Sequence, residues 1–406
     1  MISVDEAVEI VLGTAETLAP ITVFTEGSRG YVTSRPVIAD MDSPSFDRVM
    51  MDGYALMAEF SGDGAVLPVD GIIGAGEFRT DPVPDGHAVK IMTGAPLPPG
   101  TDSVIQVELT SDPGNGTVKL NAKLKSGDNV SPQGDEVRKG SVLIPAGTVI
   151  DSPAASVCAM AGLSLVEVIG LPKVGVLPTG AELVKPTSQI PAPGYIRDTN
   201  TYGIFVQSLS WGGIPIRLGY PSDDPAKIRA LIDKGLECDI LVITGGVSMG
   251  DYDYVPDILK EAGVEILFHK VAQKPGKPIL FGRRGEKYVF GLPGNPVAGY
   301  LGFELFIGPL IRRIAGETGF RTQWFKGIAA EDFKVKSDRT LFLVSKARWE
   351  DGKWAVYPVE SKGSADIASV VGTNCFARFE EGRYTVSSGD EVNFFFTRGS
   401  LYGAQR

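Results

Sequence analysis

Between Pro172 and Ala315 the chain alternates apolar strand patterns with helix patterns, and this alternation constrains the fold more than any other feature. Val174–Leu177 and Asp239–Ile243 are short and rich in β-branched residues, as buried parallel strands are. Asn200–Trp211 and Pro225–Leu236 have helical periodicity. The alternation predicts a doubly wound parallel α/β sheet with helices on both faces. The other elements predicted in this part are a helix at Val255–Ala262, strands at Ile216–Gly219, Val264–Phe268, Ile279–Phe281 and Tyr288–Gly291, and a long helix at Val297–Ala315.

Strand-rich segments flank this α/β part on both sides. Ser3 and Glu6 form a capping-box pattern that predicts a first helix over Val4–Thr17. Short strand-like runs separated by Gly and Pro fill Leu67–Gly140, which predicts a β-rich domain. After Gly316 the pattern returns to strands, so we expect a small all-β terminal domain.

Composition limits the classes of partner. The chain has 406 residues, enough for several domains, and its net charge of −10 argues against nucleic acid or an anionic membrane as the main partner. Its cysteines, Cys158, Cys238 and Cys375, lie far apart in apolar surroundings, as reduced buried thiols of a cytoplasmic protein do. With only His87 and His269, histidine-based zinc sites and Ser–His triads have little support. We expect a cytoplasmic protein without a membrane span.

The segment Thr244–Asp253, TGGVSMGDYD, follows the strand pattern Asp239–Ile243 directly. The carboxyl end of such a strand is where open α/β sheets bind ligands. Backbone N–H groups in a Gly-rich turn suit phosphate, whereas carboxylates suit a cation such as Mg²⁺. The alternative is an ordinary Gly-rich connection in which Asp251 and its neighbours only cap the next helix. The candidate residues are Thr244, Gly245, Gly246, Ser248, Gly250, Asp251 and Asp253.

Three further Gly-containing loops are predicted to lie at the same edge of the sheet: Pro178–Leu183, Lys274–Pro278 and Leu292–Val297. We expect them to meet because parallel strands share their carboxyl ends. Their candidate residues are Glu182, Lys274, Lys277, Pro278, Pro293, Gly294, Asn295 and Pro296.

Each of these loops also has a plain structural explanation. Lys274 and Lys277 flank a Pro-Gly turn that could direct both ammonium groups at one anion, or they are solvated surface lysines. Asn295 either caps a helix whose N–H groups face a ligand or only begins that helix. Glu182 is a ligand carboxylate or a solvated acid. In the N-terminal half, Asp52 and Thr93 stand at Gly-containing turns that have the same two interpretations.

Seven motifs, in this order, resemble the molybdopterin molybdenumtransferase family, the group that includes MoeA and the gephyrin E-domain. The resemblance extends over nearly the whole chain. The motifs are MDGYAL (Met51–Leu56), IMTGAPLP (Ile91–Pro98), TGAEL (Thr179–Leu183), DTN (Asp198–Asn200), TGGVSMGDYDYV (Thr244–Val255), KPGKP (Lys274–Pro278) and GLPGNPV (Gly291–Val297).

The resemblance implies a multidomain α/β plus β fold. It comprises a mixed N-terminal domain at 1–42 and 141–170, an inserted β-rich domain at 43–140, a molybdopterin-binding α/β domain at 171–318 and a C-terminal β-barrel at 319–406. It also implies a homodimer in which the β-rich domain of one subunit completes the active site on the α/β domain of the other.

The implied reaction inserts molybdenum from molybdate into adenylylated molybdopterin and releases AMP, with Mg²⁺ or a similar divalent cation. The TGGVSMG and PGNP segments would hold the pterin and pyrophosphate. Asp253, with Asp251, would be linked to the metal, and Lys274, Lys277 and Pro278 match the molybdate pocket. Asp52, Thr93 and Glu182 match further important positions. A non-catalytic scaffold and a tungstate-inserting relative are the alternatives.

The chain departs from the family pattern at several positions. Glu136 stands where the family has an Asp, and Ser131 replaces a common Arg just before it. In the last domain Val344 and Gly372 occupy the positions expected for an anion-binding Arg and a Ser. Either the alignment shifts there, with Arg339 or Arg348 substituting, or the route of molybdate entry differs.

Overall fold

The computed structural model describes residues 1–187, 189–221, 224–247 and 254–398. The chain divides into a larger unit, Met1–Ser34, Gly147–Asp151 and Glu167–Arg406, and a smaller unit, Arg35–Ala146 and Ser152–Val166. Each unit has hydrophobic cores of its own.

The larger unit contains a six-stranded sheet with the order β17-β14-β18-β22-β21-β19. Its first four strands are parallel, whereas β21 runs antiparallel to both β22 and β19. The prediction of a parallel sheet is therefore wrong for β21, because a buried strand has the same apolar pattern in either direction. The bounds are β14 (Lys173–Pro178), β17 (Ile214–Arg217), β18 (Ile240–Thr244), β19 (Glu265–Phe268), β21 (Leu280–Arg284) and β22 (Lys287–Leu292).

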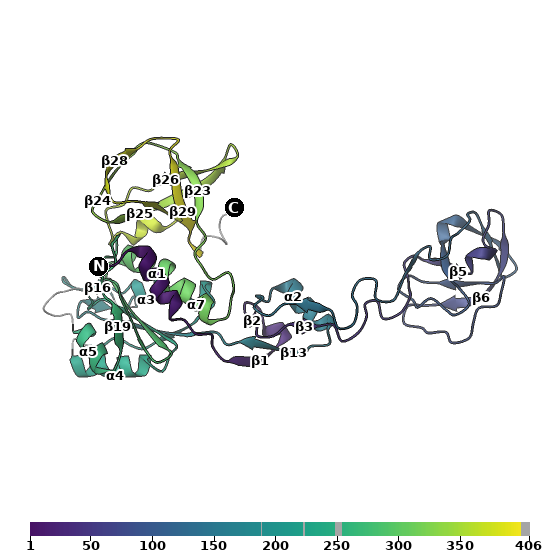
Figure 1. Cartoon of the computed structure of the whole chain (residues 1–406), viewed down its shortest axis with the longest axis horizontal. Coiled ribbons are helices and arrows are strands. Elements are labelled where there is room, and N and C mark those ends of the chain that lie inside the picture. The colour runs from purple at the N-terminus through teal and green to yellow at the C-terminus, as the bar shows by residue number, and fades with distance from the viewer. Residues whose placement is uncertain (188, 222–223, 248–253, 399–406) are drawn as a thin grey trace. The chain divides into compact units, whose positions relative to one another are not determined.

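Helices cover both faces of this sheet, as predicted. One face packs against α1 (Val4–Gly13), α3 (Asn200–Ser210) and α7 (Gly308–Ile314) in one core, and the other packs against α4 (Pro225–Gly235) and α5 (Val255–Glu261) in a second core (Figure 1). The predicted long helix is divided, because a π-helical segment, η4 (Phe303–Ile307), separates α6 (Pro296–Gly302) from α7.

The C-terminal part of the larger unit is a closed β-barrel of five strands, in which β25 pairs with both β26 and β27. It has an apolar core of its own, whereas Phe342, Val344, Phe376 and Phe395 of its strands belong to the core on one face of the α/β sheet. A short strand, β20, pairs in parallel with β25 and joins the barrel to the α/β part. The bounds are β20 (Gln273–Lys274), β23 (Phe325–Ala329), β25 (Thr340–Glu350), β26 (Lys353–Pro358), β27 (Cys375–Phe379) and β29 (Glu391–Phe396), with a two-stranded sheet of β24 (Phe333–Ser337) and β28 (Gly382–Val386) beside them.

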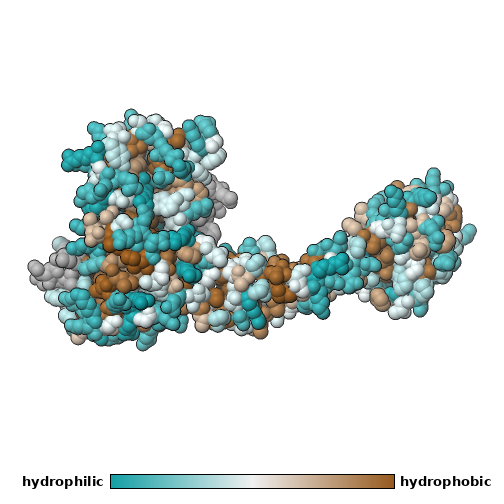
Figure 2. All heavy atoms as spheres, viewed as in Figure 1, coloured by the Kyte–Doolittle hydropathy of each residue, from teal (hydrophilic) through white to brown (hydrophobic). Residues whose placement is uncertain are grey.

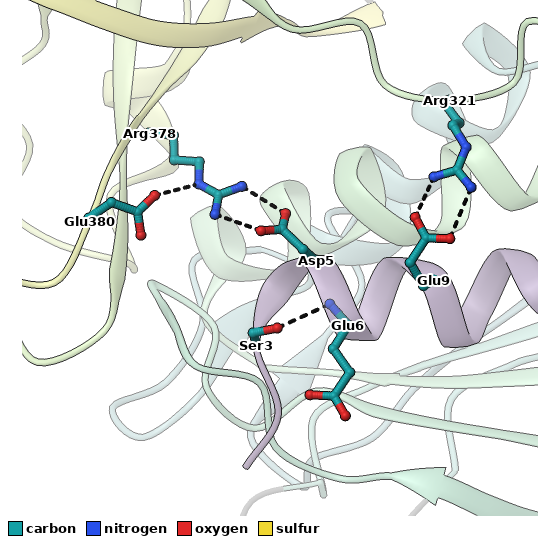
Figure 3. Close-up of polar contacts among 7 residues, drawn as sticks. All are labelled: Ser3, Asp5, Glu6, Glu9, Arg321, Arg378 and Glu380. Atoms are coloured by element: carbon teal, nitrogen blue, oxygen red, sulfur yellow. Dashed lines mark hydrogen bonds and ion pairs between the residues drawn. The ribbon is translucent and has the colours of Figure 1, made fainter.

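The N-terminal helix α1 contacts the segments that follow the α/β sheet (Figure 3). The Ser3 side chain caps it by accepting from the Glu6 N–H at 3.1 Å, as the sequence predicts, although the helix ends at Gly13 rather than near Thr17. Both carboxylate oxygens of Asp5 accept from Arg378 at 2.8 Å. Glu9 forms a second forked pair with Arg321, at 2.5 and 3.0 Å (Figure 3). These pairs join α1 to the barrel and to the chain that leads into it.

The smaller unit is mainly β-structure. Its six-stranded sheet has the order β8-β5-β7-β6-β10-β9, and two apolar cores fill the space around it. The strands are β5 (Gly53–Leu56), β6 (Val66–Ile73), β7 (Ala88–Ile91), β8 (Ser103–Gln106), β9 (Thr110–Gly114) and β10 (Thr117–Leu120), accompanied by β3 (Val37–Ile38), β4 (Arg48–Val49), β11 (Val130–Ser131), β12 (Val142–Ile144) and helix α2 (Ser152–Met160).

A three-stranded sheet, β1-β13-β2, and a two-stranded sheet of β15 and β16 complete the described strands. Their bounds are β1 (Pro20–Phe24), β2 (Val32–Thr33), β13 (Leu165–Ile169), β15 (Leu183–Val184) and β16 (Ile196–Arg197). Hydrophilic residues cover most of the visible surface, and apolar residues gather in patches (Figure 2). Across the described ranges, no helix has both the length and the hydrophobicity that crossing a bilayer requires.

Candidate functional site

Three loops of the candidate site begin at one edge of the α/β sheet because their strands end in register. Pro178 of β14 is paired with Thr244 of β18, and Thr244 is paired with Leu292 of β22. The loops that carry Glu182, Gly245 and Asn295 leave from these three positions. The prediction that they share an edge is therefore confirmed for these parallel strands.

The turn after β18 needs glycine because two backbones approach each other there. Gly245 has φ +83°, and a Cβ atom on it would overlap the carbonyl oxygen of Thr179. The N–H of Gly245 donates to the Leu292 carbonyl at 3.1 Å, and the Thr179 N–H donates to the Thr244 carbonyl at 2.8 Å. Gly246 follows with φ +61°. These contacts hold the starts of the three loops together.

The site predictions for Ser248, Gly250, Asp251 and Asp253 lie outside the described residues. At the last described position of this segment, the Val247 carbonyl lies 2.7 Å from His269 Nε2.

The lysine turn, Lys274–Pro278, lies at the same edge, as predicted. It precedes the antiparallel strand β21, and the start of that strand, Leu280, is paired with Gly291 near the end of β22. The beginning of an antiparallel strand meets the ends of its parallel neighbours. The turn also follows β19, which runs in the same direction as β22 because both strands are antiparallel to β21. The prediction from shared carboxyl ends is therefore confirmed, and only the direction of β21 differs from the expected one.

Backbone contacts fix the lysine turn on both sides. The Ile2 N–H donates to the Lys270 carbonyl at 3.2 Å and the Ala272 N–H donates to the Ile2 carbonyl at 2.8 Å, so the N-terminus pairs with the chain just before the turn. On the other side β20 is paired with the first residues of β25. The buried Gln273 side chain donates to the Pro275 carbonyl at 3.0 Å and closes the turn from within.

A cavity of about 580 Å³ opens between the lysine turn, the start of α6 and the barrel. Its charged lining residues are Lys274, Lys277 and Arg339, and the described residues around it include no carboxylate. The barrel contributes an apolar wall that includes Val344. Three cations without a lining acid, in a chain of net charge −10, favour a small anion here.

Two contacts hold Arg339, which lines this cavity. Its Nε donates to Asp338 Oδ1 at 3.0 Å, and its Nη1 donates to the Gln273 carbonyl at 3.3 Å. The Arg339 hydrogen bond is the main reason that the pKa of Asp338 lies below its usual value. Of the two arginines considered as substitutes in the last domain, Arg339 lines the cavity. Arg348 instead lies over the Tyr357 ring, 5.3 Å from its centroid.

The loop after β22 brings Pro293 and Asn295 to the cavity. Asn295 occupies the N-cap position of α6 but makes no side-chain capping bond, so its amide is not used by the helix. Gly294 is fixed by the DTN segment, because Asn200 Nδ2 donates to the Gly294 carbonyl at 2.9 Å. Pro296 is the first residue of α6, a position where its missing N–H costs nothing.

Two acids of the flanking loops have different surroundings. Glu182 is exposed in the turn after β14. Asp198 is buried and accepts from the Thr201 N–H at 3.0 Å and from the Tyr220 hydroxyl at 2.8 Å. Burial, together with this bond to Asp198, raises the pKa of Tyr220 to about 12. Asp198 therefore supports the loop that orients Asn200.

Asp52 and Thr93, 41 residues apart, form a pair on the surface of the smaller unit. Asp52 Oδ1 accepts from the Thr93 N–H at 2.7 Å and from the Thr93 hydroxyl at 2.9 Å. These two bonds, the backbone bond first, lower the pKa of the Asp52 carboxyl. The structure thus holds an ionised, exposed carboxylate in one orientation.

Glu136, the first departure from the family pattern, is also held in place. Its Oε1 lies 2.6 Å from Arg48 Nη2, and the Ser43 hydroxyl donates to its Oε2 at 3.0 Å. The bond to Arg48 is the main cause of the lowered pKa of Glu136. Arg48 is paired directly across β4–β11 with Ser131, so an arginine reaches Glu136 from the opposite strand.

Two hydroxyl residues of the cavity were not among the predicted site residues. Ser361 and Ser364 line it, whereas Gly372 does not. The Ser364 carbonyl accepts from the N–H of Val297, the second residue of α6, at 3.0 Å. The signal for both serines was the segment SKGS, a hydroxyl-rich and Gly-containing turn next to Val359.

A divalent cation is implied by the resemblance, but the described residues do not contain a complete site for it. Within them, no group of three His, Cys, Asp or Glu side chains could hold a metal ion. Glu182 is the carboxylate that the described loops bring to this edge, and Mg²⁺ usually takes one or two carboxylates together with substrate phosphate. The described donors alone therefore do not fit the ion.

Comparisons with known proteins agree across the chain. Residues 2–162 match the model of the MoeA N-terminal region (domain I and II), residues 175–313 match a probable molybdopterin binding domain, and residues 326–396 match the MoeA C-terminal region (domain IV).

Individual relatives are similar over almost their whole length. The chain is 33% identical to the molybdopterin molybdenumtransferase of Bacillus subtilis (strain 168), over 98% of this chain and 94% of the relative. It is 32% identical to the protein of that name from Staphylococcus aureus (strain MRSA252), over 98% and 96%.

The fold also matches solved structures. Two crystal structures of the molybdopterin biosynthesis MoeA protein from Pyrococcus horikoshii have TM-scores of 0.84 and 0.79 at 30% and 27% identity. Both cover 98% of this chain, and the alignments extend over 99% and 100% of those chains. This chain belongs to the MoeA family.

Proposed function

We propose that this protein is a molybdopterin molybdenumtransferase of molybdenum cofactor biosynthesis. It takes molybdate and adenylylated molybdopterin as substrates, inserts molybdenum into the dithiolene and releases AMP. The observation that carries the proposal is the cavity lined by Lys274, Lys277 and Arg339, which adjoins the loops at the edge of the α/β sheet. The names and lengths of the relatives support it.

Molybdate, a dianion, is assigned to the cationic cavity. Lys274 and Lys277 flank a turn that is fixed from both sides, so their ammonium groups start from a rigid backbone. Pro278 ends the turn and lies in the cavity wall. Arg339 adds a planar guanidinium whose fixed donors match an oxyanion. Holding the dianion beside the second substrate lowers the entropy cost of their encounter.

The pterin and its pyrophosphate are assigned to the neighbouring loops. Gly245 and Gly246 allow a ligand to approach the backbone closely, and Ser248 and Gly250 belong to the same segment. Thr244 ends the strand that presents this loop. The second wall is formed by Pro293, Gly294, Asn295 and Pro296. The side-chain amide of Asn295 makes no capping bond to α6 and is therefore available for substrate.

Mg²⁺ or a similar cation is assigned to Asp251 and Asp253 together with phosphate oxygens. When bound, this ion neutralises charge on the phosphoanhydride that is cleaved. Glu182, from the loop after β14, is the further carboxylate that the chain contributes to the reacting groups.

We further propose a homodimer whose active site is completed by a second copy. Asp52, oriented by Thr93, is the carboxylate that the smaller unit of one subunit offers to the α/β domain of the other. Exposed apolar residues on one side of α3, at 42% for Tyr202 and 63% for both Val206 and Leu209, support contact with another chain. The division into four domains at residues 43, 141, 171 and 319 is proposed with it.

The test uses purified full-length protein with adenylylated molybdopterin and Mg²⁺, with and without molybdate. AMP release that depends on molybdate, and molybdenum bound to the pterin product, are expected. Binding of adenylylated molybdopterin without AMP release under all conditions would refute the enzymatic function and favour a scaffold. Competition between molybdate and tungstate, followed by metal analysis of the product, identifies the preferred oxyanion.

A further inference from the structure

A second cationic cavity lies beside the first one. Its volume is about 430 Å³ and its lining residues are Lys274, Lys336, Ser337, Asp338, Gly382 and Arg383. Three of these six carry a positive charge and one is an acid. The outer pocket, as we call this cavity, shares Lys274 with the cavity of the lysine turn.

The two-stranded sheet of β24 and β28 builds an unfavourable charge pair into the outer pocket. Lys336 and Arg383 are directly opposite each other in this antiparallel pair, so their side chains leave the same face. Like charges at such positions destabilise a sheet unless a counter-charge lies close to them. Within the described part of the chain, neither side chain forms an ion pair, and the same is true of Lys274.

The acid of the outer pocket is already engaged. Asp338 accepts from Arg339 at 3.0 Å, and Arg339 itself belongs to the lining of the inner cavity. Ser337 is also occupied in part, since its hydroxyl donates to the Arg339 carbonyl at 2.7 Å. The ammonium and guanidinium groups of Lys336 and Arg383 therefore lack a carboxylate that could neutralise them in this pocket.

The shared lysine, Lys274, connects the outer pocket to the inner cavity. The charged side chains that line the outer pocket are exposed, and Lys274 is the cation that lines both cavities. A cluster of one sign of charge on an acidic protein concentrates small ions of the opposite sign and accelerates their capture. This effect is screened by salt, with a Debye length of about 8 Å at physiological ionic strength.

We propose that the outer pocket is a docking site for a small tetrahedral oxyanion, which passes along Lys274 into the inner cavity. The identity of that oxyanion as molybdate rests on the proposed function. Lys336 and Arg383 act in capture, and Lys277 and Arg339 act after transfer.

The kinetic test compares two variants of equal charge. The double variant Lys336→Gln/Arg383→Gln removes the outer cations, and the control Lys334→Gln/Lys346→Gln removes two exposed lysines of the C-terminal domain that line neither cavity. AMP release is measured against molybdate concentration at low and at physiological ionic strength. For the outer variant we expect the molybdate concentration at half-maximal rate to rise about tenfold, with the wild-type rate at saturation, and the difference to shrink as salt rises. The same molybdate concentration at half-maximal rate in the two variants would overturn the proposal.

Equilibrium dialysis with labelled molybdate tests the pocket without turnover. Wild-type protein should bind two equivalents per chain and the outer variant one, while the control keeps two. If the outer variant still binds two equivalents of molybdate, the docking site is refuted, even if the protein releases AMP. If the wild type releases no AMP but the variant still loses one equivalent, the proposed function fails and the oxyanion pocket stands.

Discussion

Gly245→Ala tests whether the close contact between β14 and β18 holds the candidate site together. The substitution has two costs. The residue has φ +83°, where a side chain costs about 1 kcal/mol. Its Cβ would also overlap the Thr179 carbonyl oxygen, so the strand ends must separate and the 2.8 Å bond from the Thr179 N–H to Thr244 is weakened. A buried backbone hydrogen bond lost in this way costs about 2 kcal/mol, so we expect a total near 3 kcal/mol.

Gly285→Ala is the matched control in the turn between β21 and β22. Gly285 also has a positive φ, +59°, but a Cβ atom there would meet nothing within 4 Å. It should therefore cost about 1 kcal/mol. The smaller entropy of an alanine in the unfolded chain applies to both variants and cancels in their difference.

The assay is urea unfolding of both variants, followed by circular dichroism, with AMP release measured in parallel. The difference in free energy of unfolding between the variants should be about 2 kcal/mol, and only Gly245→Ala should lose activity. Equal free energies of unfolding would refute the reasoning, because the contact with Thr179 would then carry no cost.

Three other predictions concern titratable groups. Arg378→Gln should lower the free energy of unfolding by about 1 kcal/mol at pH 7, because Arg378 holds the ionised Asp5 carboxylate. Arg378 lowers the pKa of Asp5, so this difference from wild type should vanish as the pH falls through that pKa. Unfolding curves in the acid range would show it. Thr93→Val should raise the pKa of Asp52, yet leave it below the usual value of about 3.9 because the Thr93 N–H still donates; a carboxyl NMR titration that shows no change would contradict this. Burial raises the pKa of the Cys375 thiol to about 12, so iodoacetamide should label it at pH 8 in guanidinium but not in the native protein, as mass spectrometry would detect.

Local signals in the sequence were sufficient for many elements of the fold. The Ser3 cap, the start of α4 at Pro225 and the start of α3 at Asn200 all lie where the pattern predicts them. Such starts depend on residues within one helical turn, so neighbouring sequence contains the information. Neighbouring sequence does not contain the direction of a strand, because β21 is buried and apolar whichever way it runs. The π-helical segment Phe303–Ile307 within the predicted long helix is likewise invisible to a pattern of apolar spacing.

The candidate site shows the same division. Gly-rich turns after strands correctly indicated the shared edge, because strand ends are local features. The approach of Asp52 to Thr93 depends on the pairing of distant strands, and spacing alone could not give its geometry. Arg339 could be singled out only with the barrel in view, since the paired positions Gln273 of β20 and Thr340 of β25 are 67 residues apart. Tertiary pairing decided which of two arginines faces the lysines.

Reaction of the oxyanion in the cavity of the lysine turn is tested by single-turnover AMP release from Lys274→Gln/Lys277→Gln, compared with wild type and with the charge-matched Lys334→Gln/Lys346→Gln. Adenylylated molybdopterin is supplied in equal amount to all three proteins, with Mg²⁺ and molybdate. We expect molybdate-dependent AMP release by wild type and control, and a loss of at least a hundredfold in the lysine-turn variant, about 3 kcal/mol of transition-state stabilisation. Undiminished AMP release by the lysine-turn variant would contradict the account, because the cavity of the lysine turn could not then be where the oxyanion reacts.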